Sequence, residues 1–200
     1  RVISCHLGGS SSVTGINSGV AIGTSMGMSP QSGLPQNNRV GDLDAEAIPY
    51  AVKSLGITIE EAQRQLTKES GLKGISGVSN DIRDVHKAVA DGNAKAKLAL
   101  DVYVASARHW IGSCFFEMGG ADAIAFTAGI GENDSIMRAG ICAGLEGLGI
   151  ELDSALNAST RATETVISKS SSRVKLMVIP TNEELVVARE TKRLLENSRN

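Results

Sequence analysis

The sequence Ala121-Asp-Ala-Ile-Ala-Phe-Thr-Ala-Gly-Ile-Gly-Glu-Asn133 decides the fold class. Its apolar run over residues 123–127 predicts a buried β-strand, and the glycines that follow predict a turn. A helical pattern of apolar residues continues from about Ile136. Glycine has no Cβ atom, so such a turn lets backbone N–H groups approach a ligand closely, and a helix N-terminus favours an anion there. The strand, turn and helix indicate an α/β domain with a ligand site at the turn.

A second glycine-rich turn, His6-Leu-Gly-Gly-Ser10, lies near the start of the chain. It separates two β-rich runs, which predicts a tight hairpin whose N–H groups and serine hydroxyls could bind a phosphate chain. An ordinary Gly-Ser turn has the same composition, and His6 alone is more often structural than catalytic. Two such turns in one α/β chain suggest a nucleotide held between them.

The rest of the pattern places strands first, helices next and βα units last. Three antiparallel strands are expected over residues 2–24, with the hairpin turn Asn17-Ser-Gly19 between the second and the third. A long apolar helix from Asn93 to Met118 is expected either in the core or in a subunit interface. The order implies a mixed sheet with helices on both faces. Further helices are expected at about 44–55, 58–71, 80–91, 136–148 and 181–195, and further strands near 167 and over 175–179.

Composition excludes several classes of protein. Hydrophobic residues make up 42% of the 200 residues and the net charge is −2, so nucleic acid and anionic membrane are not expected partners. The three cysteines have no metal-ligand spacing and are expected to be reduced core thiols of a cytosolic protein. The chain opens on Arg1-Val-Ile without a methionine, and we expect a fragment of a longer protein.

Two polar positions outside the glycine turns carry candidate chemistry. Arg39, at the end of a long loop over residues 25–42, could direct its guanidinium at a phosphoryl group, oriented by Asp42; otherwise it is a solvated loop charge. Glu183 or Glu184 could reach Mg²⁺, directly or through water, or the two acids could cap the helix that begins there. No Walker A sequence occurs, so a P-loop kinase is excluded, and the turn after residue 127 is not a Rossmann fingerprint because Asp134 stands at its third glycine position. His86 and His109 are expected to be structural.

Taken in order, these motifs resemble the C-terminal half of the acetate kinase family, a branch of the actin-like ATPase superfamily. The resemblance covers essentially all 200 residues. It implies an α/β fold, with a mixed β-sheet flanked by helices, of the actin-like ATPase (ribonuclease H-like) type. The motifs are His6-Leu-Gly8, Thr24-Ser-Met-Gly27, Gly41-Asp-Leu-Asp44, Asp101-x-Tyr103, Phe126-Thr-Ala-Gly-Ile-Gly-Glu-Asn133, Gly144-Leu-Glu-x-Leu-Gly149 and Pro180-Thr-Asn-Glu-Glu-Leu185.

The resemblance implies reversible phosphoryl transfer from ATP to acetate or propionate, with Mg²⁺ as cofactor. Arg39 and His6 are then the expected catalytic residues, Pro30 walls the pocket for the acyl group, and Glu183 is linked to magnesium. The substrate carboxylate is itself the nucleophile, so no general base is needed. The residues expected to bind the nucleotide are His6, Leu7, Gly8, Gly9, Ser10, Asp81, Ile82, Arg83, Ala128, Gly129, Ile130, Gly131 and Glu132.

The same resemblance implies how the chain fits into a larger enzyme. Residues 1–200 would form the C-terminal nucleotide-binding domain, and an N-terminal domain absent from this chain would supply the rest of the catalytic groups. The expected partners are a small carboxylate, that N-terminal domain and a second copy of the protein in a cytoplasmic homodimer. The fragment alone is expected to be inactive or nearly so.

Two stretches depart from the family pattern. By the resemblance, Gly9 and Ser10 stand where the family usually has Asn and Gly, and residues 31–38 differ from the usual sequence except at Gly33 and Leu34. Because the second stretch borders the acyl and phosphoryl sites, the preferred carboxylate stays open. A nucleotide-binding module of the same superfamily without kinase activity is the alternative.

Overall fold

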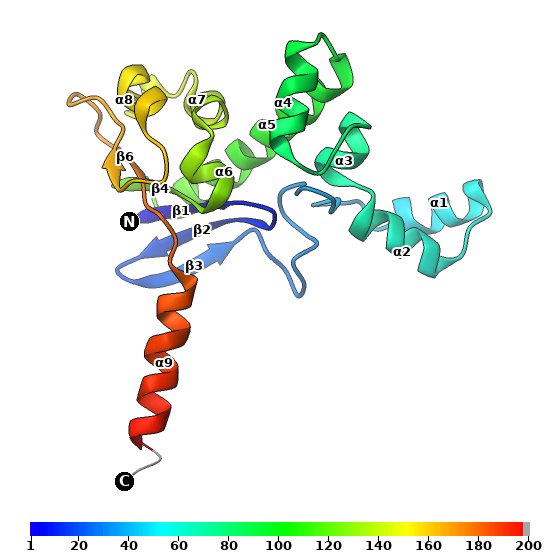
Figure 1. Ribbon diagram of the computed structural model, residues 1–200, viewed down its shortest axis with the longest axis horizontal. Helices are drawn as coiled ribbons and strands as arrows, with labels where there is room; N and C mark the ends of the chain where they lie inside the picture. Colours follow the sequence, from blue (N-terminus) through cyan, green and yellow to red (C-terminus); the bar gives the residue numbers. More distant parts are fainter. Residues whose placement is uncertain (198–200) are drawn as a thin grey trace.

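The computed structural model describes residues 1–197, which are built around a six-stranded mixed sheet (Figure 1). The strand order is β3-β2-β1-β4-β6-β5. The first three strands form an antiparallel meander, β4 lies parallel to both β1 and β6, and β5 pairs antiparallel with β6. The predicted mixed sheet is confirmed. The strands span Val2–Leu7 (β1), Ser11–Asn17 (β2), Val20–Thr24 (β3), Ala123–Thr127 (β4), Thr165–Val166 (β5) and Lys175–Val178 (β6).

Side chains alternate along β1, so one face of the sheet is buried. Ile3, Cys5 and Leu7 are fully buried, whereas the residues between them are half-exposed. Helix α5 packs against this face, where a Cβ atom on Gly15 of β2 would lie 3.2 Å from the Cβ atom of Cys114. All three cysteines are free and buried, as the sequence predicted.

Nine α-helices and one 3₁₀ helix are described within residues 1–197. They span Ala47–Leu55 (α1), Ile59–Lys68 (α2), Gly71–Ser76 (α3), Ile82–Ala90 (α4), Ala94–Glu117 (α5), Ala128–Asn133 (α6), Ser135–Cys142 (α7), Glu146–Leu148 (the 3₁₀ helix η1), Ser154–Ser159 (α8) and Glu183–Asn197 (α9). Of these, α6, α7 and α8 lie on one side of the strands, and α9 extends from the other side (Figure 1).

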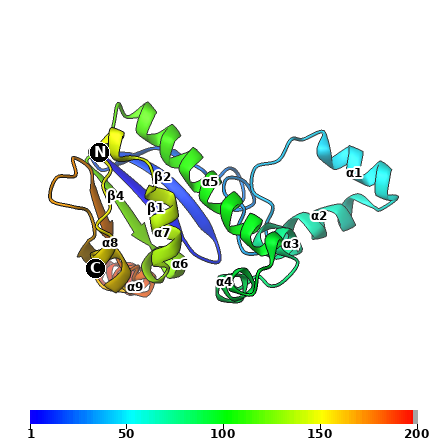
Figure 2. The ribbon, with the colours of Figure 1, turned by 90° about the horizontal axis from the view of Figure 1, so that it is seen from above.

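The long helix predicted over residues 93–118 is confirmed as α5. It begins because the Asn93 side chain accepts hydrogen bonds from the amides of Lys95 and Ala96, an N-cap that satisfies two otherwise unpaired donors. Figure 2 shows α5 running across the sheet region from one end of the molecule toward α3 and α4. One stripe of α5 is buried, so it is a core helix: Ala96, Ala99, Leu100, Tyr103, Ala107, Ile111 and Cys114.

The helices differ from those predicted at several points. Gly71 was expected to end a helix but begins α3, because its left-handed φ of +60° turns the chain between α2 and α3. The helix expected to begin near Ile136 is preceded by α6, which starts directly after β4. Helix α7 ends at Cys142, well before residue 148, and the short helix α8 was not predicted. Short helices carry too few periodic positions to be recognised from sequence.

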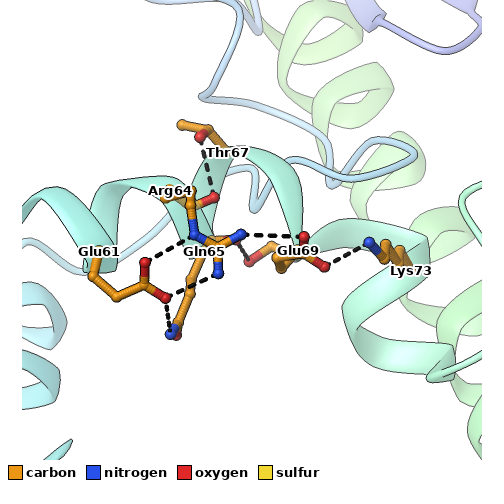
Figure 3. A network of polar contacts seen from close by, with 7 residues as sticks. Glu61, Arg64, Gln65, Thr67, Glu69 and Lys73 are labelled. Atoms are coloured by element: carbon orange, nitrogen blue, oxygen red, sulfur yellow. Dashed lines mark hydrogen bonds and ion pairs between the residues drawn. The ribbon is translucent and has the colours of Figure 1, made fainter. Parts of the chain in front are cut away.

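Helices α1 and α2 project from one end of the molecule, and α9 projects from the sheet on its own (Figure 1). None of the described residues of α1 or α9 is buried. The α2–α3 corner is held by surface ion pairs, in which Arg64 contacts Glu61 and Glu69 while Lys73 contacts Glu69 (Figure 3). No helix within residues 1–197 is both long and apolar enough to cross a membrane.

Candidate functional site

The candidate site lies where the parallel strands β1, β4 and β6 end. His6 stands beside Thr127 in the register of β1 and β4, and Phe126 stands beside Val178 in that of β4 and β6. Ligands of open α/β sheets bind outside the carboxyl ends of such strands. The segments that follow these three strands are the two glycine turns and the start of α9, so the fold gathers motifs that lie more than 100 residues apart.

A cavity of about 580 Å³ opens beside the two glycine turns. Its wall combines the hairpin after β1, the beginning of α4, and the α6–α7 region. This volume is within the range of cofactor and small-molecule pockets. The lining residues are Gly8, Gly9, Ile82, Arg83, His86, Gly129, Ile130, Asn133, Asp134, Ser135, Ile136 and Arg161.

The β1–β2 hairpin contributes fewer free donors than its sequence suggested. The amide of Gly8 donates to Ser11 Oγ at 3.2 Å, and Ser11 Oγ lies 2.8 Å from the hydroxyl of buried Tyr103. Leu7 is buried in the core and Ser10 turns toward the loop over residues 25–42, so neither lines the cavity. Gly8 and Gly9 are the hairpin residues that do.

The second glycine turn is a helix from its first residue. Ala128 takes a left-handed φ of +63°, which turns the chain sharply out of β4 into α6. Gly131 then packs closely on β4. A Cβ atom at this position would lie only 3.2 Å from the carbonyl carbon of Phe126, so the close approach favours glycine. Glu132 does not line the cavity; its Oε1 accepts from the amide of Thr181 at 2.9 Å. Gly129 and Ile130 are the residues of this turn that face the cavity.

The start of α4 forms the opposite wall. Asp81 caps the helix by accepting from the amide of Arg83 at 2.9 Å, and its carboxylate also pairs with the Arg83 guanidinium. These side-chain and backbone hydrogen bonds from Arg83 lower the pKa of Asp81 to about 2. Ile82 and Arg83 line the cavity, whereas Asp81 stands behind them as the cap.

Arg39 is anchored and is not a solvated loop charge. Its Nη1 lies 2.5 Å from Ser10 Oγ, 3.0 Å from Gln36 Oε1 and 3.3 Å from the carbonyl oxygen of exposed Pro30. Asp42 does not orient it, contrary to the sequence-based expectation. The Asp42 carboxylate accepts from the Gly33 amide and from Trp110 Nε1, which fastens the loop to α5.

Glu183 begins α9 beside His6. Its Oε1 lies 3.9 Å from His6 Nε2, and 76% of the side chain is exposed. Within residues 1–197 no group of three His, Cys, Asp or Glu residues is arranged to hold a metal ion. A single exposed carboxylate at the strand ends fits Mg²⁺, which protein sites commonly bind through one or two carboxylates together with substrate phosphates.

Six cavity residues were missed or misjudged from the sequence. His86 was expected to be structural, but it lines the cavity. The other five were assigned no role in binding: Asn133, Asp134, Ser135, Ile136 and Arg161. His86 Nε2 lies 2.7 Å from Asp134 Oδ2, joining α4 to the N-cap of α7. The two residues are 48 positions apart, so only the tertiary structure brings them together.

The His86–Asp134 contact changes how both groups bind protons. The hydrogen bond to Asp134 raises the pKa of His86, and burial opposes this only in part. Burial would raise the pKa of Asp134, but the hydrogen bonds from His86 and from the Met137 amide hold it below its ordinary value. The protonated form of His86 therefore stabilises the folded state. This contribution to the free energy of unfolding is complete below the ordinary pKa of histidine, and it is lost as the pH rises through the raised pKa of His86. On the acid side it is lost as the pH falls through the lowered pKa of Asp134.

We expect the imidazole of His86 to titrate at higher pH in the native protein than in an Asp134→Asn variant. Asparagine caps helices as well as aspartate, so α7 keeps its N-cap while the charge is removed. The measurement is an NMR pH titration of both proteins, with His86→Gln assigning the resonance. Equal midpoints in the two proteins would contradict the contact.

Comparison with known proteins places this arrangement in a family. Residues 1–189 match the model of the acetokinase family. The acetate kinase of Alkaliphilus metalliredigens is 45% identical over 195 residues, which are 98% of this chain and 49% of the relative. The acetate kinase of Treponema denticola is 47% identical over 196 residues, with coverage of 98% and 49%. The chain thus spans about half the length of the curated relatives it matches.

Solved structures agree in fold. The crystal structure of Porphyromonas gingivalis acetate kinase superposes with a TM-score of 0.94 at 36% identity, covering 98% of this chain and 49% of that one. A propionate kinase from Francisella tularensis gives a TM-score of 0.88 at 38% identity, with coverage of 94% and 48%. The predicted actin-like ATPase fold is confirmed. With the strand order, the glycine turns at the strand ends and these matches in agreement, the chain belongs to the acetokinase family.

Proposed function

We propose that this chain is the C-terminal, nucleotide-binding half of a kinase that moves a phosphoryl group reversibly between ATP and the carboxylate of acetate or propionate. The observation that carries the proposal is the cavity at the strand ends, which combines residues from all three segments expected to bind the nucleotide. The kinase names of the relatives favour this function over a nucleotide-binding module without kinase activity.

In this proposal the adenosine of ATP lies in the cavity, against Ile82 and Arg83 on one wall and Gly129 and Ile130 on the other. The phosphates extend past Gly8 and Gly9 toward His6, whose side chain is one-third exposed. A carboxylate oxygen of the substrate attacks the γ-phosphorus, and the bond to the β,γ-bridging oxygen breaks, which yields acyl phosphate and ADP. No proton has to be removed from the nucleophile.

Charge stabilisation is then the main task of the chain. Phosphoryl transfer depends chiefly on positioning and on neutralising the charge of the transferring group. Arg39, fixed beside the hairpin, is the residue we assign to this role, and His6 is assigned to the phosphates. Glu183 would hold Mg²⁺, directly or through water, and the ion when bound neutralises part of the phosphate charge.

The rest of the enzyme is also part of the proposal. We assign the missing catalytic groups to an N-terminal domain and expect a homodimer, with Pro30 bordering the acyl pocket where the parts meet. A cytoplasmic location is supported by the three free cysteines, which are kept reduced in that compartment.

The direct test is to incubate the full-length protein with ATP, Mg²⁺ and acetate or propionate, and to trap acyl phosphate with hydroxylamine. Hydroxamate should form in proportion to ADP. Absence of acyl hydroxamate with every short carboxylate tried would refute the proposed function.

Replacing Gly129 with leucine should weaken binding of ADP with Mg²⁺ by about tenfold or more, because the side chain enters the cavity and removes contacts worth at least 1.4 kcal/mol. A Cβ atom at Gly129 meets nothing within 4 Å, so the change should leave folding intact. Isothermal titration calorimetry of both proteins measures the effect.

The matched control is Gly129→Ala, whose single methyl group should cost much less affinity. Gly131 is not a suitable position for this test, since a Cβ atom there would lie only 3.2 Å from the carbonyl carbon of Phe126 in the sheet. Unchanged ADP affinity in the Gly129→Leu variant would place the nucleotide elsewhere.

A further inference from the structure

Gln36 is a buried amide at the centre of the loop that carries Arg39. It has no exposed surface, although a glutamine is rarely buried without a specific set of partners. Its Oε1 accepts from Arg39 Nη1 at 3.0 Å and from Ser10 Oγ at 3.2 Å. Its Nε2 donates to the carbonyl oxygen of Pro30 at 2.7 Å. One side chain therefore contacts the guanidinium, the glycine hairpin and the segment assigned to the acyl pocket.

The backbone of Gln36 is fixed as firmly as its side chain. Its amide donates to the carbonyl of Arg39 at 3.1 Å, and its carbonyl accepts from the amide of Leu72 at 2.8 Å. The carbonyl oxygens of the next two loop residues, Asn37 and Asn38, accept hydrogen bonds from backbone amides at the α2–α3 corner. Figure 3 shows the ion pairs on the surface of this corner. At Gly71 a Cβ atom would lie 2.1 Å from the Gln36 carbonyl oxygen, so this close approach requires glycine.

This arrangement leaves the guanidinium oriented but available. The hydrogen bonds of the Arg39 side chain to residues 1–197 all use Nη1, so Nε and Nη2 keep their donors for a ligand. A long, flexible side chain held in one orientation before the ligand binds avoids reorganisation during the reaction, which is the basis of electrostatic preorganisation.

We propose that Gln36 and Ser10 are positioning residues that hold Arg39 in the orientation needed for phosphoryl transfer and tie it to the segment at Pro30. This inference rests on the proposed function. Both residues lie in the stretches where, by the resemblance, the chain departs from the usual family pattern. A carboxylate seated beside Pro30 then meets a guanidinium whose position is set by the same amide.

The amide is needed because Gln36 both accepts and donates. Methionine has nearly the same length and volume, so Gln36→Met removes the hydrogen bonds while filling the space. In the full-length enzyme we expect this variant to lower kcat by about 10- to 100-fold, since a misplacement of about 1 Å in an active site can cost 10²-fold. The KM for ATP should change by less than about twofold, because the amide does not line the nucleotide cavity.

The decisive readout is a double-mutant cycle with Arg39→Ala. If Gln36 acts through Arg39, Gln36→Met should lower kcat no further in the Arg39→Ala background. Ser10→Ala is the second variant; it removes one hydroxyl at a half-buried site, so it should fold and show the same dependence on Arg39 with a smaller loss. Gln63→Met, the same chemical change on an exposed face of α2, is the matched control and should behave as the wild-type enzyme.

The kinetic results distinguish failure of the positioning role from failure of the proposed function. Wild-type kinetics in both Gln36→Met and Ser10→Ala, with Arg39→Ala impaired, would overturn the positioning role. Losses that multiply with that of Arg39→Ala would also overturn it, because they would show that Gln36 acts on the fold and not on the guanidinium. A wild-type enzyme that forms no acyl phosphate would refute the proposed function itself, and the inference with it.

Discussion

Changing Arg39 to alanine in the full-length enzyme is expected to lower kcat by about 10³-fold or more. The guanidinium is held at the tip of the β1–β2 hairpin by Ser10 and Gln36, next to the glycines assigned to the phosphates. Its loss removes a permanent positive charge from the place where negative charge spreads over the transferring phosphoryl group. The measurement is the rate of acyl phosphate formation at saturating ATP and carboxylate.

Arg39→Lys separates charge from geometry. The ammonium of lysine keeps the positive charge but lacks the planar guanidinium with its rigidly arranged N–H donors. It therefore cannot hold a hydrogen bond to Ser10 and direct other donors at a ligand in a fixed orientation. We expect it to recover only part of the lost rate. The KM for ATP should stay within a few-fold of its original value in both variants, because Arg39 does not line the cavity. A full rate in Arg39→Ala would favour the nucleotide-binding module without kinase activity.

Changing Arg138 to methionine is expected to lower the free energy of unfolding by about 3–5 kcal/mol. Arg138 has no exposed surface. Its guanidinium donates to the carbonyl oxygens of Gly131, Asn157 and Thr160 and to Asn157 Oδ1, at distances of 2.7–2.9 Å. Burial lowers the pKa of Arg138, although the charge of Asp134 opposes this. Without the guanidinium, these four acceptors would lose their charged donor, and the carbonyl oxygen of Asn157 would keep only the amide of Thr160 at 3.4 Å.

Urea unfolding of the domain, wild type against variant, measures this effect. Arg108→Met is the matched control, since Arg108 also donates to the carbonyl oxygens of α7 and its C-terminal end but is only half-buried, so water can replace it. Its loss should cost far less. Because Arg138 also holds the carbonyl of Gly131, the Arg138→Met variant should bind ADP more weakly as well. A loss of stability below about 1 kcal/mol would contradict the assignment.

Only some of the residues that the sequence predicted for the nucleotide site line the cavity in the structure. The two glycine turns and the start of α4 were expected to meet, and Gly8, Gly9, Ile82, Arg83 and Gly129 do line one cavity. Other predicted residues do not line the cavity but make hydrogen bonds next to it. Asp81 caps α4, and Glu132 holds the amide of Thr181. A motif identifies the segment, but not which of its side chains faces the ligand.

The sequence by itself determined the elements whose signal is local. Short β-rich runs predicted β1 and β2, whose side chains alternate in burial in the structure. Asn93 placed the start of α5 through hydrogen bonds to residues two and three positions away. Such interactions depend on backbone periodicity and on near neighbours, which the order of residues contains directly.

Only the tertiary structure decided the contacts between distant residues. It turned Ser10 and Gln36 toward Arg39, joined His86 to Asp134, and surrounded Arg138 with carbonyl oxygens. No local pattern distinguishes these polar residues from solvated ones, because a hydrogen bond across the fold depends on how strands and helices pack. That packing brings Ser10 to Arg39, 29 positions away, and His86 to Asp134, 48 positions away, and it sets the chemistry of the site.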